Sequence, residues 1–332
     1  MNHLITTVEG LENRIGKAIA MIQLKTIDHL DEGALLWLSK SPVMFAGFGN
    51  GPDISLTLGG GDPGWAQGDT HELRLPTALL DDPALARPGV GFGSVFLLPA
   101  ISEVLRVNGT VASVNGDVVT VSVKECYSHC GKALIRSAFW SALPGVAVPD
   151  EVAAFVAASR FMALATVDVH GSADVSPKGD QAAALARLEG GLVWVADRPG
   201  NKRIDSFRNI LTQPHVAAMF LIPGSTQVAY LSGTAQITAD ETVRAHFAVQ
   251  HKIPALVTAL ADAALSLRGS QALARANLWP VASPPEGIDP HQLGLAHLRL
   301  NKSLGARMVG TMMSVPGLMG KLMDEDYKKN LY

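Results

Sequence analysis

Apolar and polar positions divide the second half of the chain into short strands separated by turns. Phe161–Val167 is a continuous apolar run that ends at the turn Asp168–Gly171, which is the pattern of a buried strand. Ala173–Pro177 follows as a hairpin partner. Three more strands are predicted further along, at residues 192–196, 217–222 and 227–237. Short strands spaced by glycine and proline turns are typical of a barrel or a sandwich.

Helices are predicted beside these strands. The first covers Pro149–Ser159, because a proline near the first helical position and acidic residues in the first turn favour a helix start. The second covers Lys202–Leu211. The alanine-rich stretch 240–267 also has a helix-like composition. The expected fold class is therefore mainly β with flanking helices, an α+β arrangement.

The same pattern occurs twice in the chain. The matching segments are 95–99 with 219–223, 104–110 with 228–234 and, at a longer spacing, 132–140 with 271–279. The longer spacing of the last pair indicates an insertion in the alanine-rich stretch of the second copy. Two tandem copies joined near Pro144–Pro149 explain the pattern. We predict an N-terminal domain of residues 1–145 and a C-terminal domain of residues 146–332, the latter with a helical insert and a C-terminal tail.

Composition narrows the class of protein. The 332 residues are 48% hydrophobic and 17% charged, with a mean hydropathy of +0.21, so extensive burial is expected. The net charge of −3 gives no global reason to bind nucleic acid. Apolar stretches end well short of the about 18 residues that a membrane span needs. With Cys126 and Cys130 as its two cysteines and no signal-peptide pattern at Met1–Thr6, the chain is expected to be cytoplasmic and reduced.

A basic turn, Arg198–Arg203, stands where the apolar run Leu192–Ala196 gives way to a helix-like segment. The exposed N–H groups and the dipole at the start of a helix favour an anion. Arginine adds a planar fork of donors and lysine a point charge, which are the usual means of holding a phosphate. A solvated basic turn is the alternative interpretation.

Several strings carry a family resemblance. They are residues 165–168, 174–180, 197–203 and 209–211 in the second copy, and 105–109 and 129–140 in the first. In these the chain resembles the FMN-binding split barrels related to pyridoxamine 5′-phosphate oxidase. It is closer to an uncharacterised branch expected to use FMN than to the vitamin B6 enzyme itself. The resemblance implies two tandem split β-barrels that form a pseudo-dimer within one chain, with the flavin in the groove between them.

The resemblance also implies a cofactor site built from both copies. Its expected residues are Ser176, Lys178, Asp197, Arg198, Asn201, Lys202 and Arg203 from the second copy, and Lys132, Arg136 and Trp140 from the first. Asn201 and Arg203 are the preferred phosphate ligands. Lys132 and Arg136 are four residues apart and would share one face of a helix. Trp140 either packs on the flavin ring or fills the core.

The two copies differ in complementary ways. When Asp53–Ser55 is aligned with Asp174–Ser176, Thr57 takes the place of Lys178, and Gln67–Glu72 takes the place of the basic turn. Conversely, the second copy has Arg268, Gln271 and Ala276 in place of His129, Lys132 and Ser137. We therefore predict that one complete site survives, that its mirror image is lost, and that the N-terminal domain is a degenerate split barrel.

The function that the resemblance implies is an FMN-dependent oxidoreductase acting on a small organic substrate, with NAD(P)H or oxygen as the redox partner. No acid–base pair stands out, which agrees with chemistry carried by the flavin, and no catalytic residue is assigned. A non-catalytic flavin- or haem-binding split barrel and an F420-dependent reductase stay open as alternatives. Cys126, His129 and Cys130 are too few ligands for a zinc site, so no metal is expected. No nucleic-acid or membrane partner is expected, and a further homodimer stays open.

The methionine-rich region Met308–Met323 has two interpretations. It predicts either a helix packed against a barrel or a flexible lid over an apolar pocket.

Overall fold

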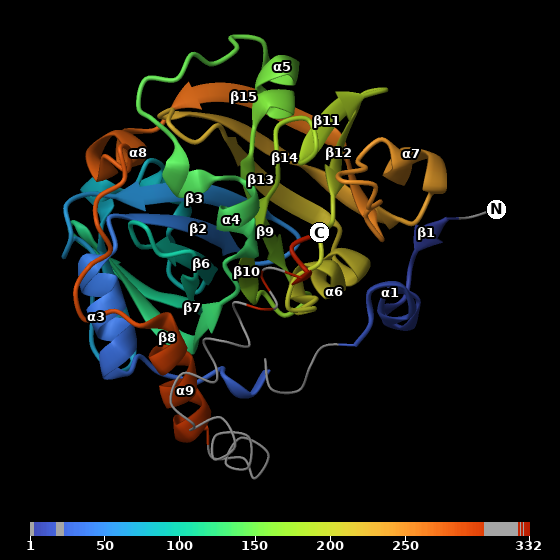
Figure 1. Cartoon of the computed structure of the whole chain (residues 1–332). Helices are drawn as coiled ribbons and strands as arrows, with labels where there is room; N and C mark the ends of the chain where they lie inside the picture. Colours follow the sequence, from blue (N-terminus) through green and yellow to red (C-terminus); the bar gives the residue numbers. More distant parts are fainter. Residues whose placement is uncertain (1–2, 18–22, 302–324, 326, 328) are drawn as a thin grey trace.

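The computed structural model describes residues 3–17, 23–301, 325, 327 and 329–332. The predictions for Met308–Met323 lie outside the described residues. Within them, no helix is long and apolar enough to cross a membrane. Two antiparallel sheets dominate the structure, and helices lie around them (Figure 1). The prediction of a mainly β fold with flanking helices is confirmed.

The first sheet has the strand order β3-β2-β6-β7-β8-β5-β4. Its strands are β2 (Val43–Gly49), β3 (Ile54–Gly60), β4 (Gln67–Gly68), β5 (Glu72–Pro76), β6 (Gly91–Leu97), β7 (Val104–Asn115) and β8 (Val118–His129). All of its strand pairs are antiparallel.

The second sheet has the order β10-β9-β13-β14-β15-β12-β11, and β1 pairs with β14 beside this path. Its strands are β1 (Leu4–Ile5), β9 (Phe161–Val167), β10 (Ala173–Gly179), β11 (Ala186–Glu189), β12 (Leu192–Ala196), β13 (His215–Leu221), β14 (Gln227–Thr238) and β15 (Val257–Gly269). Strand for strand, this order repeats that of the first sheet. The repeat seen in the sequence is therefore a repeat of the fold.

A glycine bulge lies at the same place in both copies. The ladder between β7 and β8 shifts register between Asn108 and Gly109, and the ladder between β14 and β15 shifts between Ser232 and Thr234, around Gly233. A β-carbon on Gly109 or Gly233 would overlap a carbonyl oxygen of the partner strand. Only glycine fits such a close backbone approach, which explains why the two copies share this residue.

Helices cover the sheets and connect their strands. They are α1 (Val8–Ile15), α3 (Glu32–Lys40), α4 (Lys132–Arg136), α5 (Val152–Ala158), α6 (Asp205–Thr212), α7 (Glu241–Ala245), α8 (Gln271–Ala276) and α9 (Pro290–Leu300). The helices α5 and α6 confirm the two predicted helices, but each begins three residues later than predicted. The first packs against β11, and the second packs against β9 and β14. The helix α9 packs back onto β8 and α3 of the first copy.

The helix-like interpretation of residues 240–267 is wrong over most of its length. Only α7 is helical there, and β15 occupies Val257–Gly269, buried over its first four residues and alternating between half-buried and exposed positions after them. Pairing with β14 on one side and β12 on the other outweighs the helix propensity of the alanines. The insertion of the second copy is thus the segment between β14 and β15.

Three large apolar cores and a small fourth cluster around Phe247 hold together the part of the chain that the structure describes. One lies mainly in the first copy and includes Leu293 of α9, and one lies mainly in the second and includes Leu11 of α1. The third joins the two sheets and includes Phe45, Phe139 and Phe161, whose rings pack at centroid distances of 5.4 and 5.1 Å. Trp279 completes it by donating a 2.8 Å hydrogen bond to the Phe139 carbonyl. Since this core is built from both copies, it fixes the seam between them.

Equivalent helices seal the seam at both ends. The helix α4 of the first copy packs on β10 of the second, and α8 of the second copy packs on β3 of the first. Gly179 on β10 lies against the carbonyl of Ala133, and Gly60 on β3 lies against the carbonyl of Ala272. A side chain at either glycine would overlap that oxygen. The chain is therefore an intramolecular pseudo-dimer in its contacts as well as in its strand order.

Candidate functional site

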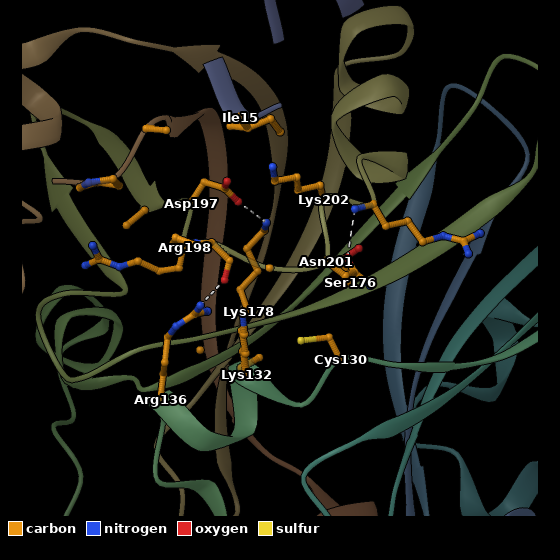
Figure 2. A pocket seen from close by; sticks show the side chains of 18 of the residues that line it. Ile15, Cys130, Lys132, Arg136, Ser176, Lys178, Asp197, Arg198, Asn201 and Lys202 are labelled. Carbon is orange, nitrogen blue, oxygen red and sulfur yellow. Dashed lines mark hydrogen bonds and ion pairs between the residues drawn. The ribbon is translucent and has the colours of Figure 1, made fainter. Parts of the chain in front are cut away.

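A cavity of about 370 Å³ opens where α4 of the first copy meets β10 and the loop after β12 of the second (Figure 2). Nine of the ten predicted site residues line it, namely Lys132, Arg136, Ser176, Lys178, Asp197, Arg198, Asn201, Lys202 and Arg203. Arg14 and Ile15 from α1 and Lys252 from the insertion also line it. Residues that are far apart in the sequence thus converge on one cavity at the seam.

The loop after β12 takes its shape from an amide side chain. Asn201 Oδ1 accepts a 3.0 Å hydrogen bond from the backbone N–H of Arg203, which closes a tight turn. Between them, Lys202 has a φ of +59°, in the left-handed region that non-glycine residues rarely adopt. Such strain persists where surrounding contacts enforce it, and it concentrates at functional sites. The Lys202 Nζ lies against Gly16, the C-cap of α1.

Lys178 projects from β10 toward the middle of the cavity (Figure 2). Its Nζ lies 3.1 Å from Asp197 Oδ1 and 4.9 Å from the centroid of the Phe207 ring. Ser176, two residues earlier on the same face of the strand, shares a 2.6 Å hydrogen bond with Ser206 at the start of α6. Strand alternation brings both side chains to the cavity, and the contacts with α6 and Asp197 hold them there.

Arg198 and Arg203 are held by acidic partners. Arg198 Nε donates to Asp180, and its Nη2 donates to the Phe247 carbonyl at 2.7 Å. Arg203 Nε donates to Asp205, its Nη1 donates to Thr26 at 3.0 Å, and its guanidinium lies 3.9 Å from the centroid of the Tyr127 ring. Both side chains shape the wall of the cavity and raise its positive potential. Arg203, chosen from the sequence as a direct phosphate ligand, thus already makes two charge-assisted hydrogen bonds within the protein.

The first copy supplies two cations from α4. Lys132 and Arg136 are both buried, and both line the cavity. Arg136 Nη2 donates to the carbonyl of Pro199 in the second copy, so it joins the two copies directly. Burial lowers the pKa of the Arg136 guanidinium from its usual value. A buried cation of this kind favours an anionic ligand, which would restore part of the solvation it has lost.

His129 was not predicted as a site residue. Its replacement by Arg268 in the second copy could have indicated it, because Lys132 is also replaced there. His129 lines the cavity, and its Nδ1 lies 3.4 Å from Asn201 Nδ2. Burial, together with the positive charges of Arg106, Arg203 and Lys178, holds the pKa of His129 well below its usual value. The imidazole is therefore neutral near pH 7 and can both donate and accept a hydrogen bond.

The remaining sequence candidates are Trp140 and the two cysteines, of which Cys130 lines the cavity. Trp140 does not line the cavity; its Nε1 donates to the Ile101 carbonyl at 2.7 Å and its ring packs on Phe139 at 4.9 Å. Trp140 was expected either to pack on the flavin ring or to fill the core, and the structure shows it packed in the core. Cys126 and Cys130 are free thiols, and burial raises the pKa of both. Among the described residues no His, Cys, Asp and Glu cluster could hold a metal ion.

The mirror-image position differs from the sequence alignment in two respects. In the second copy Lys178 pairs with Met162, and in the first copy Gly59 pairs with Met44. Because Met44 and Met162 are equivalent, the residue that replaces the lysine is Gly59 and not Thr57. The strand pairing aligns β5 with β12, so the segment equivalent to the basic turn is 78–83 and not 67–72. Sequence similarity is too weak between these segments to fix their alignment without the strand pairing.

Aspartates fill the mirror-image position. Asp81 and Asp82 stand where the second copy has Asn201 and Lys202. Asp82 pairs with Arg268, the equivalent of His129, at 2.7 Å. Asp81 accepts hydrogen bonds from Ser270 Oγ at 2.5 Å and from the backbone N–H of Ala272 at 2.8 Å. Protein carboxylates thus neutralise the groups that an anionic ligand would need.

Comparison with known proteins identifies part of the chain. Residues 148–276 match the family described as pyridoxamine 5′-phosphate oxidase. This segment contains β9 to β15 and the basic turn. None of the curated proteins compared matches the chain.

Three solved structures resemble about a third of the chain each. The HupZ protein of Group A Streptococcus is 19% identical, covers 34% of this chain and 93% of its own, and has a TM-score of 0.28. A protein titled F420 Reductase is 17% identical, with coverages of 36% and 98% and a TM-score of 0.27. General Stress Protein 26 of Bacillus anthracis is 15% identical, with coverages of 35% and 89% and a TM-score of 0.28. TM-scores this low do not support a functional assignment.

Proposed function

We propose that this chain binds one FMN in the cavity at the seam and acts as an FMN-dependent oxidoreductase on a small organic substrate. The match of residues 148–276 to the pyridoxamine 5′-phosphate oxidase family supports this proposal. The observation that carries the proposal is the convergence of cations from both copies on one cavity. Its volume of about 370 Å³ falls within the range of roughly 300–1,000 Å³ that small-molecule and cofactor sites occupy.

The charge of the cavity suits a phosphate. Eight of its lining residues carry a positive charge and one, Asp197, carries a negative charge. Arg198 and Arg203 are paired with Asp180 and Asp205 behind the wall, so the excess rests mainly on the lysines, Arg14 and Arg136. In a partly buried cavity such an excess attracts a dianion more strongly than it would on an open surface. Lys178, Lys202 and Asn201 are the proposed phosphate ligands.

The other groups of the cavity suit a flat polar ring. Ile15, Phe207 and Pro254 give it apolar surface, and Ser176 and the neutral His129 offer hydrogen bonds. When bound, the isoalloxazine ring supplies the redox chemistry by accepting or donating hydride or electrons. The protein would then bind the flavin, orient it and limit the access of water to its ring. These tasks agree with the lack of an acid–base pair in the sequence.

A flavin titration tests the proposal. We expect the purified protein to bind FMN, giving a protein-bound flavin spectrum that bleaches on addition of NAD(P)H. A Soret band on addition of haem would support a haem-binding protein instead. Copurified F420, identified by mass spectrometry, would support an F420-dependent reductase. The absence of any flavin binding would contradict the proposal.

Lys178→Met tests the assigned cation cluster. It removes a charge from the centre of the cavity and leaves Asp197 without its 3.1 Å partner. We expect FMN binding to weaken by about 1.5–3 kcal/mol, the size of a hydrogen bond to a charged group, or roughly tenfold to a hundredfold in Kd. Isothermal titration calorimetry would measure it. Lys124→Met, on an exposed position of β8, is the control and should leave the Kd unchanged.

A further inference from the structure

The last two residues of the sequence, Leu331 and Tyr332, lie at the cavity. Arg136 Nε donates a 2.5 Å hydrogen bond to the Leu331 carbonyl, and Lys252 Nζ donates a 2.8 Å hydrogen bond to the main-chain oxygen of Tyr332. Figure 1 marks this end of the chain, which lies far in sequence from the α4 residue that it contacts. Two cations of the cavity thus bind main-chain oxygens of the protein itself.

The Tyr332 ring occupies the space between two arginines. The guanidinium carbons of Arg136 and Arg198 lie 5.7 and 5.6 Å from its centroid, within the range of cation–π contacts. Its hydroxyl donates a 3.0 Å hydrogen bond to Asp180, the carboxylate that also holds Arg198. Tyr332 is therefore held by four groups, on its ring, its hydroxyl and its backbone.

A second tyrosine, Tyr327, holds the same C-terminal segment, whose described residues are 325, 327 and 329–332. The Tyr327 hydroxyl donates to Glu103 at 3.0 Å and accepts from the backbone N–H of Gly131 at 3.1 Å. Lys132 Nζ lies 5.9 Å from the centroid of its ring. In contrast, Lys329 between the two tyrosines is exposed and pairs with Glu325 on the segment itself. The two tyrosines thus contact both cations of α4, and Tyr332 also lines the cavity.

These contacts compete with a ligand for the same groups. Arg136 and Lys252 are cations that an anionic ligand would use, and both bind the segment instead. Arg198 is already paired with Asp180 and contacts the Tyr332 ring as well. A neutral carbonyl and an aromatic ring are weaker partners for a buried guanidinium than a phosphate or carboxylate. An anion can therefore displace the segment, at an affinity reduced by the contacts it must break.

We propose that Leu331 and Tyr332 form an autoinhibitory strap that covers Arg136 and Arg198 in the wall of the cavity and that an anionic ligand must displace. This proposal requires only that the cavity binds an anion. The identity of that ligand as FMN rests on the proposed function above.

Tyr332→Ala in the full chain tests the strap, with inorganic pyrophosphate and FMN as separate probes in calorimetry. We expect both dissociation constants to fall at least fivefold. Tyr332→Phe, which keeps the ring and loses the hydrogen bond to Asp180, should give a smaller decrease. Lys329→Ala, on the exposed part of the segment, is the matched control and should change neither constant. An unchanged or increased pyrophosphate constant for Tyr332→Ala would overturn the proposal.

Hydrogen exchange of the unaltered protein gives a second readout. Saturating pyrophosphate should speed the exchange of the peptide that contains Tyr332, because the ligand displaces it. Slower exchange would mean that the segment closes over the ligand, and would also overturn the proposal. If pyrophosphate responds as expected while FMN does not bind at all, the strap stands and the proposed function fails.

Discussion

His129 shows how the cation cluster changes the chemistry of a neighbouring residue. Its pKa lies well below the usual value of about 6.5 because the ring is removed from water and because Arg106, Arg203 and Lys178 repel a further positive charge. A protonated His129 would add to a cluster that already has an excess of positive charge. The neutral ring instead provides a hydrogen-bonding group beside Asn201 without a charge of its own.

This shift predicts a pH dependence of stability. Above about pH 6.5 His129 is neutral in both the folded and unfolded states. Below that pH His129 is protonated in the unfolded chain but stays neutral in the folded protein. The free energy of unfolding therefore falls as the pH falls. When the pH is lowered from 7.5 to 5.5, the free energy of unfolding of the parent should fall by up to about 1.4 kcal/mol more than that of His129→Gln. Urea unfolding at the two pH values would measure this difference. His170→Gln, at an exposed turn, should lose as much as the parent; equal slopes for all three would contradict the prediction.

At the scale of side chains, the sequence could predict which residues gather but not what each one binds. The string Arg198–Arg203 and the pair Lys132 and Arg136 were identified as one cluster, and they line one cavity. Their partners Asp180, Asp205 and Thr26 come from other elements, so no local pattern shows that the two arginines are already paired. Tyr332 was missed for the same reason, since only the folded chain brings it near Arg136.

At the scale of elements, apolar runs predicted the strands well and the alignment of the two copies less well. The alignment of Lys178 with Thr57 was wrong by two residues. A shift of two residues leaves every side chain on the same face of a strand, so the hydrophobic pattern cannot detect it. Only the pairing of β3 with β2 and of β10 with β9 fixes the register. Likewise β15 has a helix-like composition, and only its two neighbouring strands make it a strand.

The contacts of α4 and α8 with the opposite copy give a prediction for elements. Gly179→Val and Gly60→Val each force a side chain against a helix carbonyl, of Ala133 and Ala272 respectively. Each should lower the free energy of unfolding by about 1–3 kcal/mol, the usual cost of overpacking, as measured in urea. Gly269→Val, where no atom lies within 4 Å of the added carbon, is the control.

The two glycine variants should differ in ligand binding. Gly179→Val displaces α4, which carries Lys132 and Arg136, so FMN affinity should fall with stability. Gly60→Val displaces α8 at the mirror-image position and should leave FMN affinity near that of the parent. Equal losses of affinity in both variants would show that binding follows stability and not the position of α4.

At the scale of the whole molecule, duplication of the fold does not duplicate the site. Asp81 and Asp82 pair with Arg268, Ser270 and the backbone of α8, which leaves the mirror-image position without the excess of positive charge seen at the cavity. We expect one FMN per chain, measured by flavin absorbance against protein concentration. Arg268→Met should leave that ratio and the Kd unchanged, whereas Lys178→Met weakens binding. A ratio near two would contradict the single-site prediction.

The shared core between the sheets predicts that the two copies behave as one unit even when the chain is cut between them. The connecting segment is exposed, with Leu143 at 73% and Val146 at 43% of full exposure, so a protease recognition sequence can be placed there. After cleavage the halves should coelute in gel filtration, because Phe45, Phe139 and Phe161 pack across the seam. In addition, β1 stays paired with β14, and α9 stays packed on β8. The halves should separate only in denaturant; their separation in native buffer would show that the linker, and not the core, holds the pseudo-dimer together.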